Sequence, residues 1–415
     1  MSKRRGFLKF SGAVSGLSIG GGFPGPWMRS VAAKVLKGKS SDRKILVVVQ
    51  LSGGNDGLNT IVPHRDEFYR KVRPKLAIPS SDVIPLDDSL GAHPSLQPFD
   101  RLWDAQRFAI IQGVGYEKPN RSHFESMDIW HTCSSNRNRS RAGWLGRMFA
   151  ESHGSSGADA PGIHLGSEPL PLALVEKSVP VPSIGSIDQF RWKSGRSVSR
   201  GSIVPGSQSQ VEPMREASTA PDDLLGFLSS STQAAIAASE RIETALGRNH
   251  PDFAFPDTPL GQKLRAVARL ILAGLQTSVY YVTLDGFDTH ANQLAVHSGL
   301  LRQWSEALSA FHEAITQDGQ SDRVLSLTFS EFGRRVAENA SQGTDHGAAA
   351  PVFLSGPIFP KLLSGEAPNL TNLVDGDVRY SVDFRSVYRT LMEEWFGVTS
   401  GGIIQGDFPK LALFS

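Results

Sequence analysis

Residues 284 to 293 read LDGFDTHANQ and place two carboxylates and one imidazole, those of Asp285, Asp288 and His290, within six positions. They come directly after the apolar run SVYYVTL, which is typical of a buried strand. These side chains could cap a following helix, but three such groups exceed what one helix cap requires. Carboxylates and imidazoles are common ligands of divalent cations, so the pattern favours a metal site where this strand ends.

Polar groups also flank four other apolar runs. They are Asp56 in a glycine-rich turn after KILVVVQL, Arg121, Ser122 and His123 after RFAIIQGVG, Glu331, Arg334 and Arg335 after RVLSLTF, and Asp345 with His346 before PVFLSG. Ligands in open α/β sheets bind beyond the carboxyl ends of the strands. The recurrence of such groups at several strand ends therefore predicts one common pocket.

Some of these groups also have purely structural interpretations. Residues 55 to 57, Asn-Asp-Gly, form an ordinary turn sequence, and residues 345 to 347 could form another. Ser122 and Glu125 have the spacing of a capping box, in which the hydroxyl only satisfies backbone amides. The same position would also point the Ser122 hydroxyl at a helix N-terminus, where the helix dipole stabilises an anion.

Uninterrupted apolar runs predict the strands that position these groups. The runs are residues 44–51, 107–115, 278–284, 323–329 and 351–356. Apolar stripes at helical spacing predict helices over residues 301–315 and 260–271, with Thr258 as N-cap and Pro259 at the first helical position of the second. A final helix is expected from Phe384 to Trp395. Strands that alternate with helices predict an α/β sandwich with helices on both faces of a largely parallel sheet.

Composition narrows the class of protein. The apolar share of 40% and the charged share of 20% in 415 residues are typical of a soluble globular protein. A net charge of +2 without a long basic block excludes an electrostatic footprint for nucleic acid. The single cysteine, Cys133, excludes an internal disulfide framework and any cysteine-based zinc cluster. Residues 193–250 include a Ser-, Gly- and Pro-rich stretch and predict a loop or helical insertion within one domain.

The N-terminus resembles a twin-arginine export signal. Arg4 and Arg5 stand in SKRRGFLKF, before a weakly hydrophobic Gly- and Ser-rich stretch, and residues 30–32 offer a small-x-small cleavage site. We therefore expect a signal peptide at residues 1–32 and a mature chain of residues 33–415 that the twin-arginine translocase carries to the periplasm or otherwise exports from a bacterium. No other segment approaches the ~18 apolar residues of a spanning helix, so no membrane span is expected after cleavage.

Six motifs in order resemble a known bacterial family. They are LSGGNDGLNTIVP, NRSHFESMDIW, FDTHANQ, FSEFGRR, TDHGAAAPVFLSG and DFRSVY, and they extend over nearly the whole mature chain. Together they resemble the family called "domain of unknown function 1501", which is placed by similarity with the alkaline phosphatase and sulfatase superfamily. The resemblance implies an alkaline phosphatase-like three-layer sandwich, but it brings no established activity.

The resemblance also implies roles for individual residues. Asp56 is similar to the first metal-binding Asp of that superfamily, and Ser122 to its nucleophile. LDGFDTHAN is similar to an Asp-x-x-x-His metal site. However, the spacing from Asp285 to His290 is one residue too long and that from Asp288 is too short, so either aspartate could be the ligand.

The fourth and fifth of these motifs imply further ligands and one departure from the pattern. TDHGAAAPVFLSGP resembles a segment that carries a ligand histidine, here His346, and the Asp-His-Gly of phosphomutases, in which Asp345 would bind as well. If His346 takes the first of these roles, Ser330 and Glu331 stand where the resemblance implies an Asp-His pair, so that Glu331 is the ligand candidate there and one imidazole is missing. This departure puts a full two-metal site in doubt.

These residues predict an exported, metal-dependent hydrolase of phosphate or sulfate esters, acting on a small-molecule or glycan ester. A serine hydroxyl such as that of Ser122 is unreactive at pH 7 unless a base or a metal lowers its pKa. One or two divalent ions would serve, Zn²⁺ or Mn²⁺ for mixed ligands and Mg²⁺ or Ca²⁺ if carboxylates dominate. Arg121 would clamp the anion bidentately, with Arg334 and Arg335 as weaker candidates.

Two other interpretations remain open at this point. A non-catalytic exported domain that keeps this fold and binds a glycan or a partner protein would explain the irregular spacing at 285–290 and the substitution at 330–331. A sulfatase with a modified cysteine is disfavoured, because Ser135 replaces the proline of a C-x-P-x-R site after Cys133.

Overall fold

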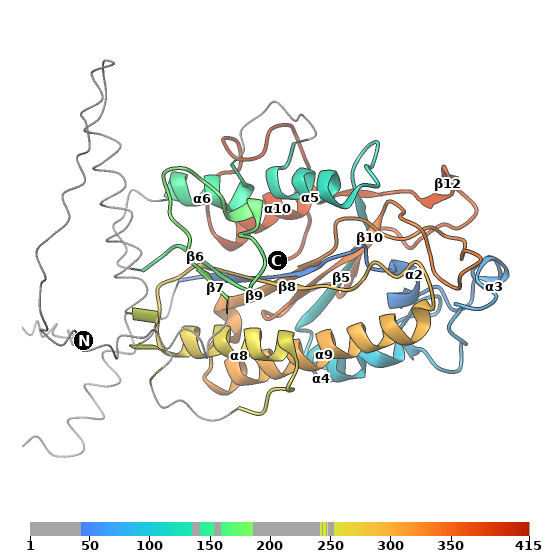
Figure 1. Ribbon diagram of the computed structural model, residues 1–415, viewed down its shortest axis with the longest axis horizontal. Helices are drawn as coiled ribbons and strands as arrows, with labels where there is room; N and C mark the ends of the chain where they lie inside the picture. The colour runs from blue at the N-terminus through green and yellow to red at the C-terminus, as the bar shows by residue number, and fades with distance from the viewer. Residues whose placement is uncertain are drawn as a thin grey trace, which may run out of the picture. The chain divides into compact units, whose positions relative to one another are not determined.

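The apolar runs predicted to be strands lie side by side in one sheet of the computed structural model (Figure 1), which describes residues 43–134, 142–152, 159–185 and 253–414, with residues 241, 242, 244, 245 and 247. The predicted signal peptide at 1–32 lies outside these residues, as does nearly all of the predicted insertion at 193–250. The described residues all belong to one compact unit, residues 42–415.

The central sheet has nine strands in the order β11-β5-β10-β9-β1-β8-β6-β7, with β14 also paired to β5. Its strands are β1 (Ile45–Leu51), β5 (Phe108–Gly115), β6 (Gly162–Leu165), β7 (Ser183–Ile184), β8 (Val279–Leu284), β9 (Val324–Phe329), β10 (Ala350–Ser355), β11 (Leu363–Ser364) and β14 (Val382–Asp383). All five predicted strands are confirmed to within one residue at each end.

Strand β10 alone runs against its neighbours in this sheet. It pairs antiparallel with both β5 and β9, whereas every other pair in the sheet is parallel. The N-terminal end of β10 therefore lies at the same edge as the carboxyl ends of β1, β8 and β9. For this reason Asp345 and His346, which precede their strand, can meet side chains that follow the other strands.

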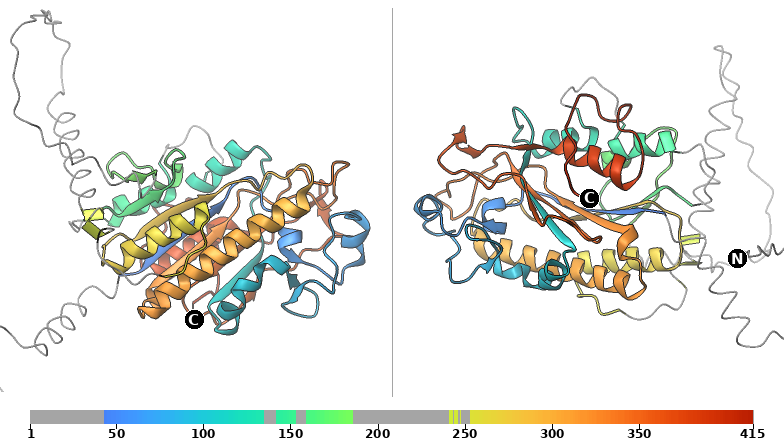
Figure 2. Two further views of the ribbon diagram at one scale, coloured as in Figure 1. Left: turned by 60° about the horizontal axis from the view of Figure 1, so that its bottom comes forward. Right: turned by 180° about the vertical axis from the view of Figure 1, so that it is seen from behind.

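Helices cover both faces of the sheet (Figure 1). One face carries α8 (Pro259–Leu272) and α9 (Gln293–Gln317), which lie side by side (Figure 2), and the other carries α5 (His123–Thr132), α6 (Trp144–Ser152) and α10 (Phe384–Thr390). Alternate residues of β1 face opposite layers, so that Val47 packs with Trp304 of α9 while Val48 packs with Trp130 of α5. The predicted three-layer α/β sandwich with a mostly parallel sheet is confirmed.

The predicted helices are also present. α8 has Thr258 at its N-cap, where Oγ1 accepts from the backbone N–H of Gly261 at 3.1 Å. α10 continues as a single π-helical turn, Leu391–Trp395. α9 begins at Gln293, two turns before the predicted start, because Gln293 and His297 extend the buried stripe of the helix with polar side chains.

Short elements complete the described chain. They are α2 (Gly57–Thr60), β2 (Ile61–Val62), α3 (Glu67–Val72), β3 (Ile84–Pro85), β4 (Gly91–Ala92), α4 (Asp100–Asp104), the hairpin of β12 (Leu373–Val374) and β13 (Asp377–Val378), and the 3₁₀ turns Pro94–Phe99, Leu172–Leu174 and Ser321–Arg323. Among the described helices none combines the length and the apolar character needed to cross a membrane.

Candidate metal centre

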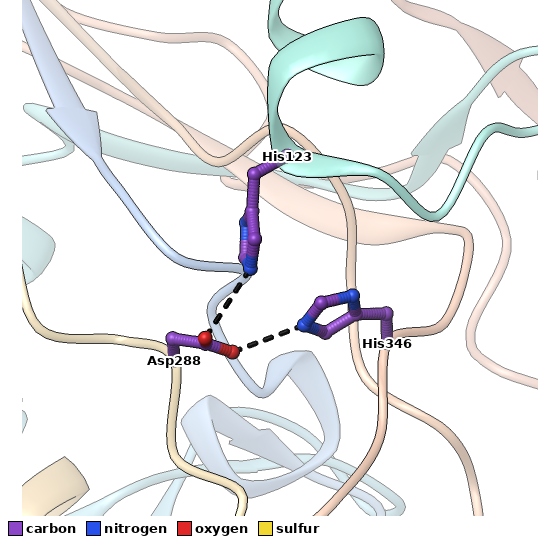
Figure 3. Close-up of side chains that lie close together, drawn as sticks. All are labelled: His123, Asp288 and His346. Carbon is purple, nitrogen blue, oxygen red and sulfur yellow. Dashed lines mark hydrogen bonds and ion pairs between the residues drawn. The ribbon is translucent and has the colours of Figure 1, made fainter.

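Three side chains from distant parts of the chain converge at the sheet edge (Figure 3). His123 is the first residue of α5, Asp288 lies in the loop after β8, and His346 precedes β10. One ligand atom from each lies within 4.8 Å of the others. Oδ2 of Asp288 is 3.4 Å from Nε2 of His123, and Oδ1 is 3.0 Å from Nε2 of His346. These three residues form the candidate metal centre.

Both histidines are held through their other ring nitrogen. Nδ1 of His123 lies 2.8 Å from Oε1 of Glu331, and Nδ1 of His346 lies 2.7 Å from the backbone carbonyl oxygen of Arg121. A carboxylate and a carbonyl only accept hydrogen bonds, so each Nδ1 donates and carries the proton. In the neutral rings Nε2 then presents a lone pair to Asp288. This arrangement is typical of metal-bound histidines, which are oriented by an acceptor behind the ring.

A third imidazole adjoins the centre. Nε2 of His290 lies 3.1 Å from Oδ1 of Asp288 and 3.0 Å from Nε2 of His346, while its Nδ1 lies 3.3 Å from Oδ1 of Asp345. Three Nε2 atoms therefore surround one carboxylate, and each ring has its Nδ1 next to an acceptor. Acceptor atoms facing one another at these distances repel unless a proton or a cation lies between them, so the donor set fits a divalent cation.

Two buried charged residues, Arg334 and Glu331, hold the segments that carry the candidate metal centre together. Arg334 donates from Nη2 to Oδ1 of Asp288 at 2.8 Å and to the carbonyl oxygen of Phe287 at 2.9 Å. Its Nε donates to the carbonyl oxygen of Gly54 at 2.7 Å, and its Nη1 donates to the carbonyl oxygen of Thr344 at 2.7 Å. One guanidinium thus joins the loop after β1, the loop after β8 and the segment before β10. Glu331 joins separate segments in the same way, because its Oε1 accepts from the backbone N–H of Gly53 at 2.9 Å as well as from Nδ1 of His123.

Gly53 allows two of these loops to approach closely. Its φ is +115°, a region that favours glycine, and a Cβ added there would lie 2.4 Å from the backbone nitrogen of Asp288. Any side chain at this position would push the Asp288 loop away from the sheet edge. The glycine-rich turn after β1 is therefore a packing requirement of the centre.

The charge of the centre follows from its contacts. Burial by itself would raise the pKa of Asp288, but the hydrogen bond and the positive charge of Arg334 lower that pKa to about 2. The hydrogen bond to Glu331 raises the pKa of His123 above its ordinary value. The side chain of Asp288 is 47% exposed and that of His290 45%, so the centre is open to solvent and accessible to a ligand.

Two predicted ligands lie outside the centre. Asp56 is buried, and its Oδ2 lies 2.6 Å from Nη1 of Arg73 and accepts from Nε2 of Gln293. Burial would raise the pKa of Asp56, but the charge and hydrogen bond of Arg73 bring it below the ordinary value. Asp285 is exposed and does not belong to the centre. Of the two aspartates that the spacing left open, the structure brings Asp288 to the histidines.

The other predicted site residues lie around the centre in supporting positions. Glu331 and Asp345 contact the Nδ1 atoms of His123 and His290. His123 itself received no metal role from the sequence, although its position beside the predicted nucleophile at a strand end was the signal that could have found it.

Ser122 is the N-cap residue of α5, but its hydroxyl makes no capping hydrogen bond, so the capping box is not formed. Its backbone N–H donates instead to Oδ1 of Asn120 at 2.8 Å. Arg121 donates from Nε at 3.0 Å and from Nη2 at 2.5 Å to Oδ2 of Asp377, which leaves Nη1 outside this pair. Cys133 is buried, and burial raises the pKa of its thiol to about 12, as expected of an inert core residue.

Solved structures with a similar arrangement of elements include three of named origin. The C-terminal periplasmic domain of EcEptC from Escherichia coli, in complex with Zn, is 8% identical, with a TM-score of 0.37 over 88% of this chain and 85% of that one. The PsFucS1 sulfatase from Pseudoalteromonas sp. is 10% identical, with a TM-score of 0.37 over 90% and 72%. A protein in the alkaline phosphatase superfamily from Vibrio parahaemolyticus is 8% identical, with a TM-score of 0.40 over 85% and 66%.

No curated protein sequence matches the chain. Residues 109–360, more than half of the 415, match the family described as "Protein of unknown function (DUF1501)". This stretch contains all but the first residue of β5, the whole of α5, β8 and β9, and all three residues of the candidate metal centre. The chain belongs to the DUF1501 family.

Proposed function

We propose that this protein is an exported, metal-dependent hydrolase of phosphate or sulfate esters. The observation that carries the proposal is the convergence of three imidazole Nε2 atoms on the carboxylate of Asp288, with each Nδ1 beside an acceptor. Such a set of nitrogen and carboxylate donors suits Zn²⁺ or Mn²⁺. The exposure of Asp288 and His290 leaves room for substrate beside the cation.

The residues have distinct tasks in this proposal. A bound cation would polarise the ester and lower the pKa of a neighbouring hydroxyl or water. His123, His346 and Asp288 hold the cation, and Arg334 keeps Asp288 ionised and in place. Ser122 is the proposed nucleophile because its hydroxyl is not used for capping and it precedes His123 at the start of α5. Hydrolysis consumes one water and releases an alcohol with phosphate or sulfate.

The role of Arg121 is modified by its contact with Asp377. Two of its donors point at one buried carboxylate oxygen, so the bidentate clamp expected from the sequence requires Arg121 to leave Asp377. In its present position Arg121 offers Nη1 to an anion and its backbone carbonyl to His346. The contact between Arg121 and Asp377 also favours a second candidate function, a binding domain that holds a cation without turnover.

A matched pair of substitutions tests the proposal. Asp288→Asn should abolish metal binding and hydrolysis across a panel of phosphate and sulfate esters with Zn²⁺ or Mn²⁺ added back. Asp285→Asn, which changes the exposed aspartate three residues earlier, should retain the metal. Metal bound at one equivalent without turnover on any ester would support the binding domain. Full metal content and activity in Asp288→Asn would refute the proposed centre.

A further inference from the structure

Asp56 and Arg73 form a completely buried ion pair at the sheet edge that carries the candidate metal centre. Nη1 of Arg73 lies 2.6 Å from Oδ2 of Asp56, and neither side chain is exposed to solvent. Asp56 follows β1, a central strand, so its position suits a cation ligand. In this chain the positive charge beside Asp56 is a guanidinium.

Arg73 is fixed in this position by further acceptors. Nε donates to the carbonyl of Val336 at 2.8 Å, Nη2 to that of Arg335 at 2.8 Å, and Nη1 also to Oδ1 of Asn59 at 2.7 Å. Every nitrogen of the guanidinium thus donates to a protein acceptor. Moving it away would leave a buried carboxylate without a counter-charge, which is strongly unfavourable.

The remaining surroundings of Asp56 leave little room for a second ion. Oδ2 also accepts from Nε2 of Gln293, whose Oε1 accepts from Oγ1 of Thr344 at 2.7 Å. Oδ1 is buried and has no hydrogen-bond partner. A divalent cation at Oδ1 would be repelled by the fixed charge of Arg73, and buried charges are poorly screened. Among the described residues, the only cluster of metal-ligand side chains is the one at His123, Asp288 and His346.

We propose that the protein holds one divalent cation, at the candidate metal centre, and that Arg73 takes the place of a second cation at Asp56. The inference rests on the proposed metal centre, and it gives that centre a stoichiometry. The positive charge at Asp56 is then permanent and does not depend on the supply of metal. Chemistry at the sheet edge proceeds with a single exchangeable ion.

Counting the ions in the full-length protein tests this. The protein is loaded with Zn²⁺, loosely bound metal is removed, and the remaining ions are counted by elemental analysis. The wild type and Asp56→Asn should each contain one ion per chain, and Asp288→Asn should contain none. Two ions in the wild type, of which Asp56→Asn loses one, would overturn the inference while leaving the metal centre in place. A single ion in the wild type that Asp56→Asn loses would place the ion at Asp56 and overturn both. No ion in the wild type would remove the metal centre itself, and the inference with it.

Removing the guanidinium gives a second readout that does not depend on activity. Arg73→Met leaves Asp56 uncompensated, so its melting temperature should fall, and Zn²⁺ should restore part of the loss by binding as a second ion. The double variant Asp56→Asn/Arg73→Met, which lacks both charges, should bind one ion and show only the wild-type shift with Zn²⁺. An extra Zn²⁺ shift that persists in the double variant would contradict the inference. If Arg73→Met does not fold, the ion count of Asp56→Asn decides.

Discussion

Oε1 of Glu331 lies 2.8 Å from Nδ1 of His123 and orients the ring so that Nε2 faces Asp288. Glu331 is 1% exposed, so this contact is well shielded from water. The carboxylate makes the imidazole a stronger base and fixes which nitrogen is available to a cation. In the proposed centre Glu331 would therefore contribute to metal affinity through the ring of His123.

Glu331→Gln should weaken metal binding by about 10- to 100-fold, the usual cost of losing a partner behind a metal-bound histidine. The amide oxygen can still accept from His123 and Gly53, so the fold should persist. The dissociation constant is measured by competition with a chelator. Glu313→Gln, on the exposed surface of α9, is the control. Equal affinity in wild type and Glu331→Gln would contradict this role.

Gly53→Ala should destabilise the protein and reduce its metal content, because its Cβ would lie 2.4 Å from the backbone nitrogen of Asp288. Gly274→Ala is a matched control, since Gly274 also has a positive φ, +84°, but a Cβ there meets nothing within 4 Å. We expect about 1 kcal/mol for the strain alone at Gly274 and a larger loss at Gly53. Chemical denaturation measures both, and equal losses would show that the two loops do not pack as described.

Ser122→Ala should lower kcat for ester hydrolysis by at least about 1000-fold while leaving the metal content unchanged. The hydroxyl makes no capping hydrogen bond, so its removal should have little effect on the melting temperature. Ser81→Ala, at an exposed position, is the control. Undiminished turnover in Ser122→Ala would assign the attack to a water molecule instead.

Stability should fall in acid because of His131, which is buried and contacts Gln50 and Tyr281. Burial lowers the pKa of His131 to about 3, whereas in the unfolded chain it is about 6.5. Between these values only the unfolded state takes up the proton, so His131 costs about 1.4 kcal/mol per pH unit as the pH falls from 6.5. His131→Gln, which does not titrate, should show a shallower dependence of unfolding free energy on pH. Identical slopes would exclude this effect.

The sequence was informative where side-chain pattern alone determines structure. The run at 45–51, which is rich in β-branched residues, is typical of a strand buried on both faces, and Thr258 with Pro259 marks a helix start by local chemistry. The early start of α9 could not be predicted in this way, because its first buried turns carry Gln293 and His297 in place of apolar residues. Their burial depends on hydrogen bonds to Asp56 and Asn55, far away in the sequence.

The sequence predicted where the candidate site lies but not which side chains contact one another there. Polar groups at strand ends indicated the correct sheet edge for Asp288, His290 and His346, whereas no local pattern shows that Arg73 neutralises Asp56. The orientation of His123 depends on Glu331, which lies 208 residues later in the chain. Such contacts arise from the strand order, which the sequence does not display.

The reversed direction of β10 has a consequence for how this architecture can vary. Because β9 and β10 are adjacent and antiparallel, the chain turns back at the edge that carries the candidate metal centre, and the connection at residues 330–349 supplies Glu331, Arg334 and His346. An insertion in this segment would enter the candidate metal centre, whereas an insertion in a crossover helix such as α8 would not. We expect relatives that differ in ligand preference to differ first in the length of this turn.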